Sequence, residues 1–168
     1  DRTMIDQDND GDVDMWVGAH DGTLYYFENT GSNTNPAFTA RTGGDNPMNG
    51  VDVGSYAAPT MIDQDNDGDV DMWVGAGYSG KLSYFENTGS NTNPVFTART
   101  GGDNPMNGVD VGYWAKPTMI DQDNDGDVDM WVGAIDGKLN YFSAIFCQKK
   151  QTCNSRGFCQ IKNKLVPT

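Results

Sequence analysis

The chain has little of what many enzymes and membrane proteins depend on. It contains a single histidine, His20, and no cysteine in its first 146 residues. Leucine and isoleucine are scarce, and no stretch approaches the ~20 apolar residues that a membrane-spanning helix needs. Neither a serine–histidine nor a cysteine–histidine catalytic arrangement can be built from so few parts. We therefore expect no enzymatic activity and no insertion into a membrane.

Basic residues are also few, and they are unevenly placed. The net charge is −13, and residues 1–136 hold all 24 acidic residues, whereas the segment after residue 136 is basic and holds no acidic residue. An acidic body repels phosphate groups, so we expect no nucleic-acid partner.

What the chain does have is a repeat. The fourteen residues DQDNDGDVDMWVGA occur at 6–19, 63–76 and 121–134. Residues 28–54 match residues 86–112 at every position except Ala37, which becomes Val95. Such similarity means that the units occupy equivalent environments. We predict a first repeat at 1–59, a second at 60–117, a partial third at 118–143, and a basic, cysteine-containing tail at 144–168.

Within a unit, apolar and polar residues alternate with the period of a β-strand. The predicted strands are 13–17, 23–29, 37–41 and 58–62, separated by turns and long surface loops rich in Gly, Asn and Pro. Four short strands in each unit predict an all-β fold made of tandem four-stranded β-propeller-type blades, about two and a half of them. Trp16, Trp73 and Trp131 recur at one place and are expected in the core between blades.

Each repeat carries the pattern D-x-D-x-D-G-x-x-D. Carboxylates on alternate residues converge on one point only if the chain curls, and Gly11, Gly68 and Gly126 permit the positive φ that a curl needs. Oxygen ligands of this kind suit Ca²⁺, and we expect about one ion in each repeat, three in the chain. The predicted side-chain ligands are Asp6, Asp8, Asp10 and Asp14; Asp63, Asp65, Asp67 and Asp71; and Asp121, Asp123, Asp125 and Asp129. The backbone carbonyl groups of Asp12, Asp69 and Asp127 are expected to complete the three sites.

These loops differ from an EF-hand. An EF-hand ends with a bidentate glutamate at its twelfth position, on a helix. Here that position is Val17, Val74 or Val132, inside a predicted strand.

The string PTMIDQDNDGDVDMWVG, followed by a turn and L-x-Y-F-E-N-T-G, resembles the FG-GAP/VCBS repeat family, which includes the integrin alpha-chain propellers. The resemblance covers residues 1–143 and implies calcium-bearing β-propeller blades in an extracellular or cell-surface setting. Closed propellers have more blades than this. The resemblance therefore leaves open a part of a larger propeller, a ring completed by several chains, or an open array.

The tail has its own resemblance. Cys147, Cys153 and Cys159, with C-N-S-R-G-F-C between the last two, resemble the first half of an EGF-like module. This implies an oxidising compartment and disulfide partners outside the segment. An unrelated cysteine-bearing linker is the alternative.

Three functions stay open from the sequence. The first is a structural or adhesive extracellular module that pairs with other copies of itself or with protein ligands. The second is a glycan-binding, lectin-type propeller that uses loop aromatics such as Trp114, with Tyr56, Tyr78 and Tyr113 as similar candidates. The third and weakest is a polysaccharide-active enzyme in which this chain is a scaffold and the catalytic residues lie outside it.

Overall fold

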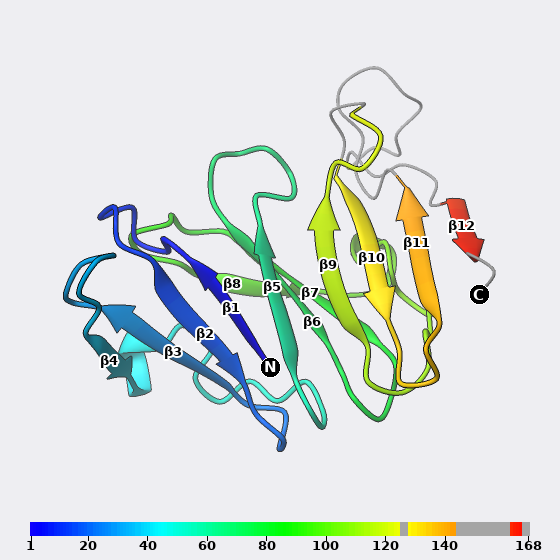
Figure 1. Cartoon of the computed structure of the whole chain (residues 1–168), viewed down its shortest axis with the longest axis horizontal. Helices are drawn as coiled ribbons and strands as arrows, with labels where there is room; N and C mark the ends of the chain where they lie inside the picture. The colour runs from blue at the N-terminus through cyan, green and yellow to red at the C-terminus, as the bar shows by residue number, and fades with distance from the viewer. Residues whose placement is uncertain (125–127, 144–161, 166–168) are drawn as a thin grey trace.

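The structure is a computed structural model that describes residues 1–124, 128–143 and 162–165. Within these ranges the chain is all-β and made of tandem four-stranded blades, as the sequence predicts. Three antiparallel four-stranded sheets stand side by side as open blades (Figure 1), where the sequence predicts about two and a half. Blade 1 contains β1 (Arg2–Ile5), β2 (Asp14–Gly18), β3 (Leu24–Asn29) and β4 (Phe38–Arg41). Blade 2 contains β5 (Ala58–Ile62), β6 (Asp71–Gly75), β7 (Leu82–Asn87) and β8 (Phe96–Arg99). Blade 3 contains β9 (Lys116–Ile120), β10 (Asp129–Gly133), β11 (Leu139–Ser143) and β12 (Lys162–Leu165).

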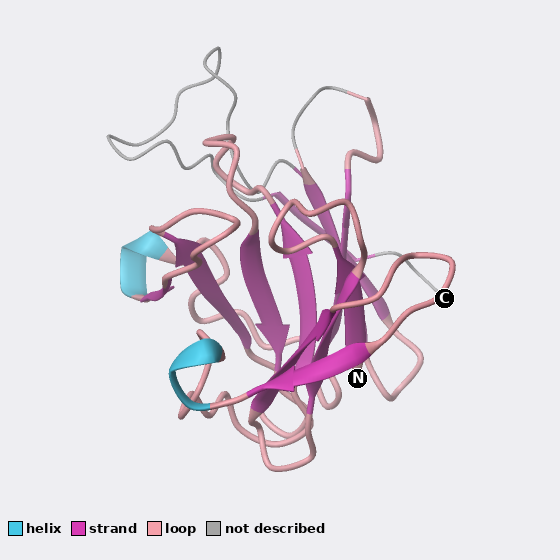
Figure 2. Cartoon of the chain, turned by 90° about the vertical axis from the view of Figure 1, so that its left-hand side faces the viewer, coloured by secondary structure: helices cyan, strands magenta, loops and turns pink. Residues whose placement is uncertain are grey.

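The strands of blades 1 and 2 pair in chain order, because short turns bring each strand back beside the one before it. The first strands of neighbouring blades approach one another, with β5 in contact with both β1 and β9. Two single-turn 3-10 helices, Gly43–Asp45 and Gly101–Asp103, lie on the same side of the molecule (Figure 2). In blade 3 the fourth strand is β12, which pairs antiparallel with β11 and comes from the segment that the sequence alone places in the tail.

Tryptophan forms the core between blades, which confirms the sequence prediction for two of the three positions. Trp16 is fully buried and packs in one cluster with Met72 and Val74 of the next blade. Trp73 is buried in the same way against blade 3. Trp131 is only half-buried, because no further blade within the described residues covers its face. Each blade therefore presents a tryptophan face to the methionine–valine face of the blade that follows.

A glutamine side chain holds the buried indole of each covered blade. The Gln7 side chain accepts a hydrogen bond from Trp16 Nε1 at 3.1 Å and donates one to the carbonyl oxygen of Asn91, in blade 2, at 3.4 Å. Gln64 accepts the equivalent bond from Trp73 Nε1 at 2.8 Å. Both side chains are almost completely buried, so these bonds satisfy polar groups that water cannot reach.

The prediction of surface loops was wrong for one residue in each long loop. Met48 and Met106 are each only 1% exposed and belong to the two clusters between blades. The Asn46 side chain donates to the Leu24 carbonyl oxygen at 3.0 Å, and its Oδ1 accepts from the Met48 backbone N–H. These bonds turn the loop inward, so that the methionine side chain packs in the core between blades.

The glycine that ends the second strand of a blade lies against the backbone of the next blade. A Cβ built on Gly18 would lie 2.1 Å from the carbonyl oxygen of Ala57, and a Cβ on Gly75 would lie 2.1 Å from that of Ala115. The equivalent Gly133 of blade 3 has nothing within 4 Å. Glycine at the first two positions is therefore what lets the backbones of two blades approach.

The third glycine is a matched control for the second. We expect Gly75→Ala to lower the free energy of unfolding by about 1–3 kcal/mol, because blades 2 and 3 must move apart. Gly133→Ala should change it by less than ~0.5 kcal/mol. Denaturant unfolding in the presence of calcium measures both, and equal effects of the two substitutions would contradict the packing described here.

Candidate metal centre

The acidic loops share one end of the blades. Each joins the first strand of a blade to its second strand, whereas the hairpin turns between second and third strands lie at the opposite end (Figure 1). The repeat therefore sets the loops along one edge of the array, each at the same place in its blade.

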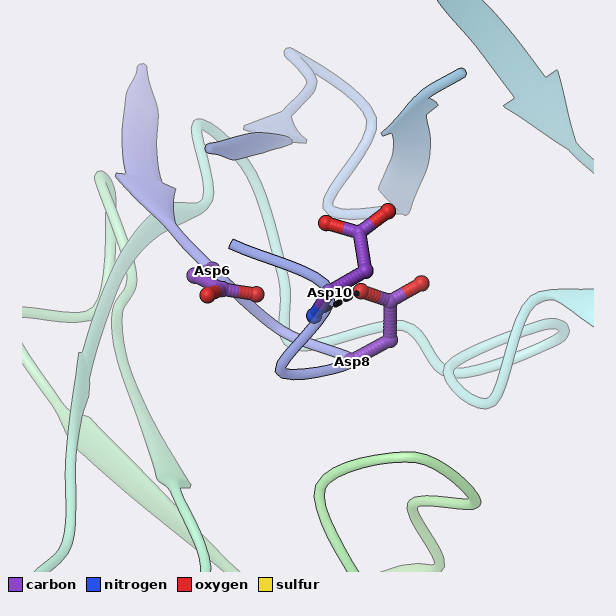
Figure 3. Close-up of side chains that lie close together, drawn as sticks. All are labelled: Asp6, Asp8 and Asp10. Carbon is purple, nitrogen blue, oxygen red and sulfur yellow. Dashed lines mark hydrogen bonds between the residues drawn. The ribbon is translucent and has the colours of Figure 1, made fainter. Parts of the chain in front are cut away.

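Three aspartates in each loop come close enough to share one ion. One carboxylate oxygen from each of Asp6, Asp8 and Asp10 lies within 4.8 Å of the other two. Figure 3 shows these side chains gathered around the bend, with Asp6 approaching from the end of β1. The other two groups that meet this distance are Asp63, Asp65 and Asp67, and Asp121, Asp123 and Asp129. The described residues thus contain three sites able to hold a metal ion, one in each blade.

The curl that brings the carboxylates together is visible in the backbone. Gly11 has φ of 95° and Gly68 has φ of 98°, as the sequence predicts, and Asn9 also adopts a positive φ of 60°. The Gly11 N–H donates to Asp6 Oδ2 at 3.0 Å, and the Asp10 N–H donates to Asp8 Oδ1 at 3.2 Å. These bonds close the loop on itself and leave other carboxylate oxygens for an ion. Gly126 lies outside the described residues.

A buried oxygen tests whether the loop fits a cation. Asp6 Oδ1 and Asp63 Oδ1 are both shielded from solvent, and neither has a hydrogen-bond partner among the described residues. A buried acceptor without a partner is costly, and it is rare in folded proteins. A cation held by the triad would satisfy this oxygen, so the residues present fit a metal ion.

Desolvation and repulsion within the loops point the same way. Partial desolvation raises the pKa of Asp8; the Asp10 N–H lowers it in part, and the carboxylates of Asp14 and Asp10 raise it. Partial desolvation, followed by the charge of Asp67, raises the pKa of Asp65, although this residue lies at the surface. A divalent cation would reverse both effects, because it favours the charged form of every carboxylate around it.

The last aspartate of the pattern has a second set of partners. Asp14 is buried at the start of β2; its Oδ1 accepts from the Asn29 N–H at 2.7 Å, and its Oδ2 accepts from the Gln7 N–H and the Tyr26 hydroxyl, each at 3.1 Å. The equivalent Asp71 makes the same three bonds, and burial raises its pKa to about 7. This residue therefore ties the metal loop to the end of the third strand and to the tyrosine on that strand.

The structure brings some of the predicted ligands into the triads and leaves the role of others a prediction. Asp129 accepts from the Tyr141 hydroxyl at 2.9 Å and also contributes an oxygen to the third triad, so the two roles are compatible. For Asp14 and Asp71, and for the carbonyl groups of Asp12 and Asp69, a place in the metal shell stays a prediction. Asp125 and Asp127 lie outside the described residues.

Two asparagines hold the metal loops in place through hydrogen bonds. The sequence reasoning missed both of them. Asn33 donates from its backbone N–H to Asp12 Oδ1 and from Nδ2 to the Gly11 carbonyl oxygen, and its Oδ1 accepts from the Val13 N–H, at 2.7 to 2.8 Å. Asn91 makes the same contacts in blade 2. The signal was the repeated N-T-G-S-N-T-N-P segment, which reads as a plain turn until its contact with the metal loop is seen.

The two glutamates each pair with an arginine of the same blade. Glu28 accepts a forked pair of bonds from Arg41 Nε and Nη2, and Glu86 does the same with Arg99. Each pair joins the third strand of a blade to its outer strand.

Comparison with known proteins does not assign this chain to a family. No protein-family model matches the chain, and no curated protein matches it. The resemblance to FG-GAP/VCBS repeats stays a prediction. The described part of the chain contains no helix with the length and apolar character needed to cross a membrane.

The asparagine clamp gives a test of the centre. In the double variant Asn33→Ala/Asn91→Ala, we expect calcium affinity to fall about tenfold or more, because the loops lose the groups that hold their ligands in place. The control is Asn35→Ala/Asn93→Ala, which alters exposed asparagines of the same segments. Calorimetric titration measures both, and equal affinities for the two variants would contradict the clamp.

Proposed function

We propose that the chain is a non-enzymatic, calcium-binding repeat module of the extracellular space, with a structural or adhesive role. The three triads and the buried carboxylate oxygens support the metal part of this proposal. The half-buried end faces of the array, which no further blade covers among the described residues, support the structural part.

Calcium is the ion that this chemistry favours. All of the ligand groups are oxygen, which suits a hard cation, and the loops are built of carboxylates on a flexible bend. Magnesium is a poorer fit, since it demands a near-ideal octahedron and keeps several of its waters. Extracellular calcium is millimolar, which would fill even sites with dissociation constants of about 10⁻⁴ M. The ions would then be permanent parts of the fold.

The end faces carry the assembly part of the proposal. Met72 and Val74 are fully buried because blade 1 covers them, whereas the equivalent Met15 and Val17 are only half-buried. At the other end, Trp131 is half-buried where Trp73 is fully buried. Among the described residues, the first and last blades therefore present the two halves of the contact that already joins blades within the chain. We propose that a second copy supplies the missing half, by ring completion or head-to-tail stacking.

A single substitution tests assembly. We expect the protein in calcium to form larger particles as its concentration rises, and Val17→Lys to remain monomeric, because a buried ammonium group would oppose docking. Asn107→Lys adds the same charge to an exposed loop and should behave as the unsubstituted protein. Sedimentation velocity measures particle size, and circular dichroism checks that each variant is folded. A protein that stays monomeric at all concentrations would contradict self-assembly.

A further inference from the structure

Aromatic side chains gather at the edge of the array opposite the metal loops. Tyr56, Tyr78, Tyr113 and Trp114 are between 36% and 61% exposed, whereas Trp16 and Trp73 are fully buried. Tyr56, Tyr113 and Trp114 lie in the segments that connect successive blades, and Tyr78 lies in the β6–β7 turn of blade 2. We refer to the four together as the aromatic edge.

The rings of the aromatic edge form a connected group. The Tyr56 ring lies 5.3 Å from that of Tyr78, 5.7 Å from that of Trp114 and 4.3 Å from the imidazole of His20, measured between centroids. The planes are tilted or perpendicular, at 44° to 82°. The rings therefore pack at a tilt or edge to face around Tyr56, and Tyr78 and Trp114 stay 58% and 41% exposed.

Trp114 lines a surface hollow of about 210 Å³ together with His20, Tyr56 and Lys116, among others. The Lys116 ammonium group pairs there with the Asp1 carboxylate at 2.8 Å. Trp114 also belongs to a shallow, open surface that it forms with Tyr78, Tyr113 and Ile135. The indole is thus shared by a hollow and an open aromatic surface, with hydroxyl and imidazole groups beside it.

Two residues of the aromatic edge have an uncommon backbone conformation. Tyr56 and Trp114 occupy equivalent positions in successive units and have φ of 55° and 61°, a region that bulky residues rarely adopt. The Tyr56 N–H donates to the His20 carbonyl oxygen at 2.9 Å, and the Trp114 N–H donates to that of Gly77 at 2.5 Å. Each ring is therefore fixed to the turn of the preceding blade. Strain kept at an exposed aromatic position favours a role in binding.

These contacts also narrow the class of ligand. The backbone groups that join the turns already bond to each other, with the Ala57 N–H bound to the Ala19 carbonyl oxygen as a further example, so the edge is poorly suited to adding an extended peptide strand. A ligand must be held mainly by side chains. A pyranose ring offers C–H groups to aromatic faces and hydroxyl groups to the polar side chains around them.

We propose that the aromatic edge is a binding site for a neutral glycan chain, with one sugar ring in the hollow beside Trp114 and a second on the open surface formed by Tyr78, Tyr113 and Trp114. This gives the glycan-binding alternative a definite place in the structure. It is independent of metal binding and of self-assembly, because no residue of the aromatic edge belongs to the triads or to the end faces.

The test uses cellohexaose and chitohexaose as probes, titrated by calorimetry into the whole chain in calcium. We expect at least one of them to bind, Trp114→Ala to weaken that binding about tenfold or more, and Trp114→Phe to retain part of it. Phe38→Ala removes an exposed ring on β4, away from the aromatic edge, and should leave the affinity unchanged.

Three outcomes would overturn the site. These are no binding of either probe, an equal loss in Trp114→Ala and Phe38→Ala, and Trp114-dependent binding of decaproline in place of the glycans. The Val17→Lys variant separates the two proposals. It should bind the probes as the unsubstituted protein does, whether or not self-assembly is observed.

Discussion

The buried carboxylate at the start of the second strand is the interaction on which the rest of the structure depends. Asp14 accepts hydrogen bonds from the metal loop through Gln7, from the end of β3 through Asn29, and from Tyr26. Tyr26 stacks on Trp16 with centroids 4.7 Å apart, and Trp16 packs on the next blade. A continuous path of contacts therefore leads from the metal loop through one carboxylate to the core between blades.

That arrangement explains why so acidic a protein can fold. Each loop gathers five aspartates within nine residues, and without a counter-charge their repulsion opposes the curl that the blade requires. A bound divalent ion turns the same carboxylates into ligands. The apolar core between blades is rich in methionine, tryptophan and tyrosine, with one buried leucine in each cluster.

Much of the fold and of the metal loops could be predicted from the sequence, because the same residue pattern occurs in each repeat. The strand at 58–62 matches β5, and the other predicted strands begin one residue early. Trp16, Trp73 and the carboxylates that converge in each loop also follow from period and spacing. Long-range contacts could not be predicted. The Asn33 clamp joins residues twenty apart, Met48 turns inward through bonds made by Asn46, and Tyr56 meets Trp114 only because two blades stand side by side. Sequence spacing carries no information about such meetings.

Thermal unfolding of the whole chain by differential scanning calorimetry, in calcium and in chelator at equal ionic strength, tests the central claim most directly. Ligand binding to the folded state alone stabilises it by about 2.7 kcal/mol at a hundredfold excess over the dissociation constant, which corresponds to roughly 5–10 °C for a domain of this size. The account predicts a rise of at least that order in calcium and a much smaller one in magnesium. A melting temperature that is the same in calcium and in chelator would contradict it.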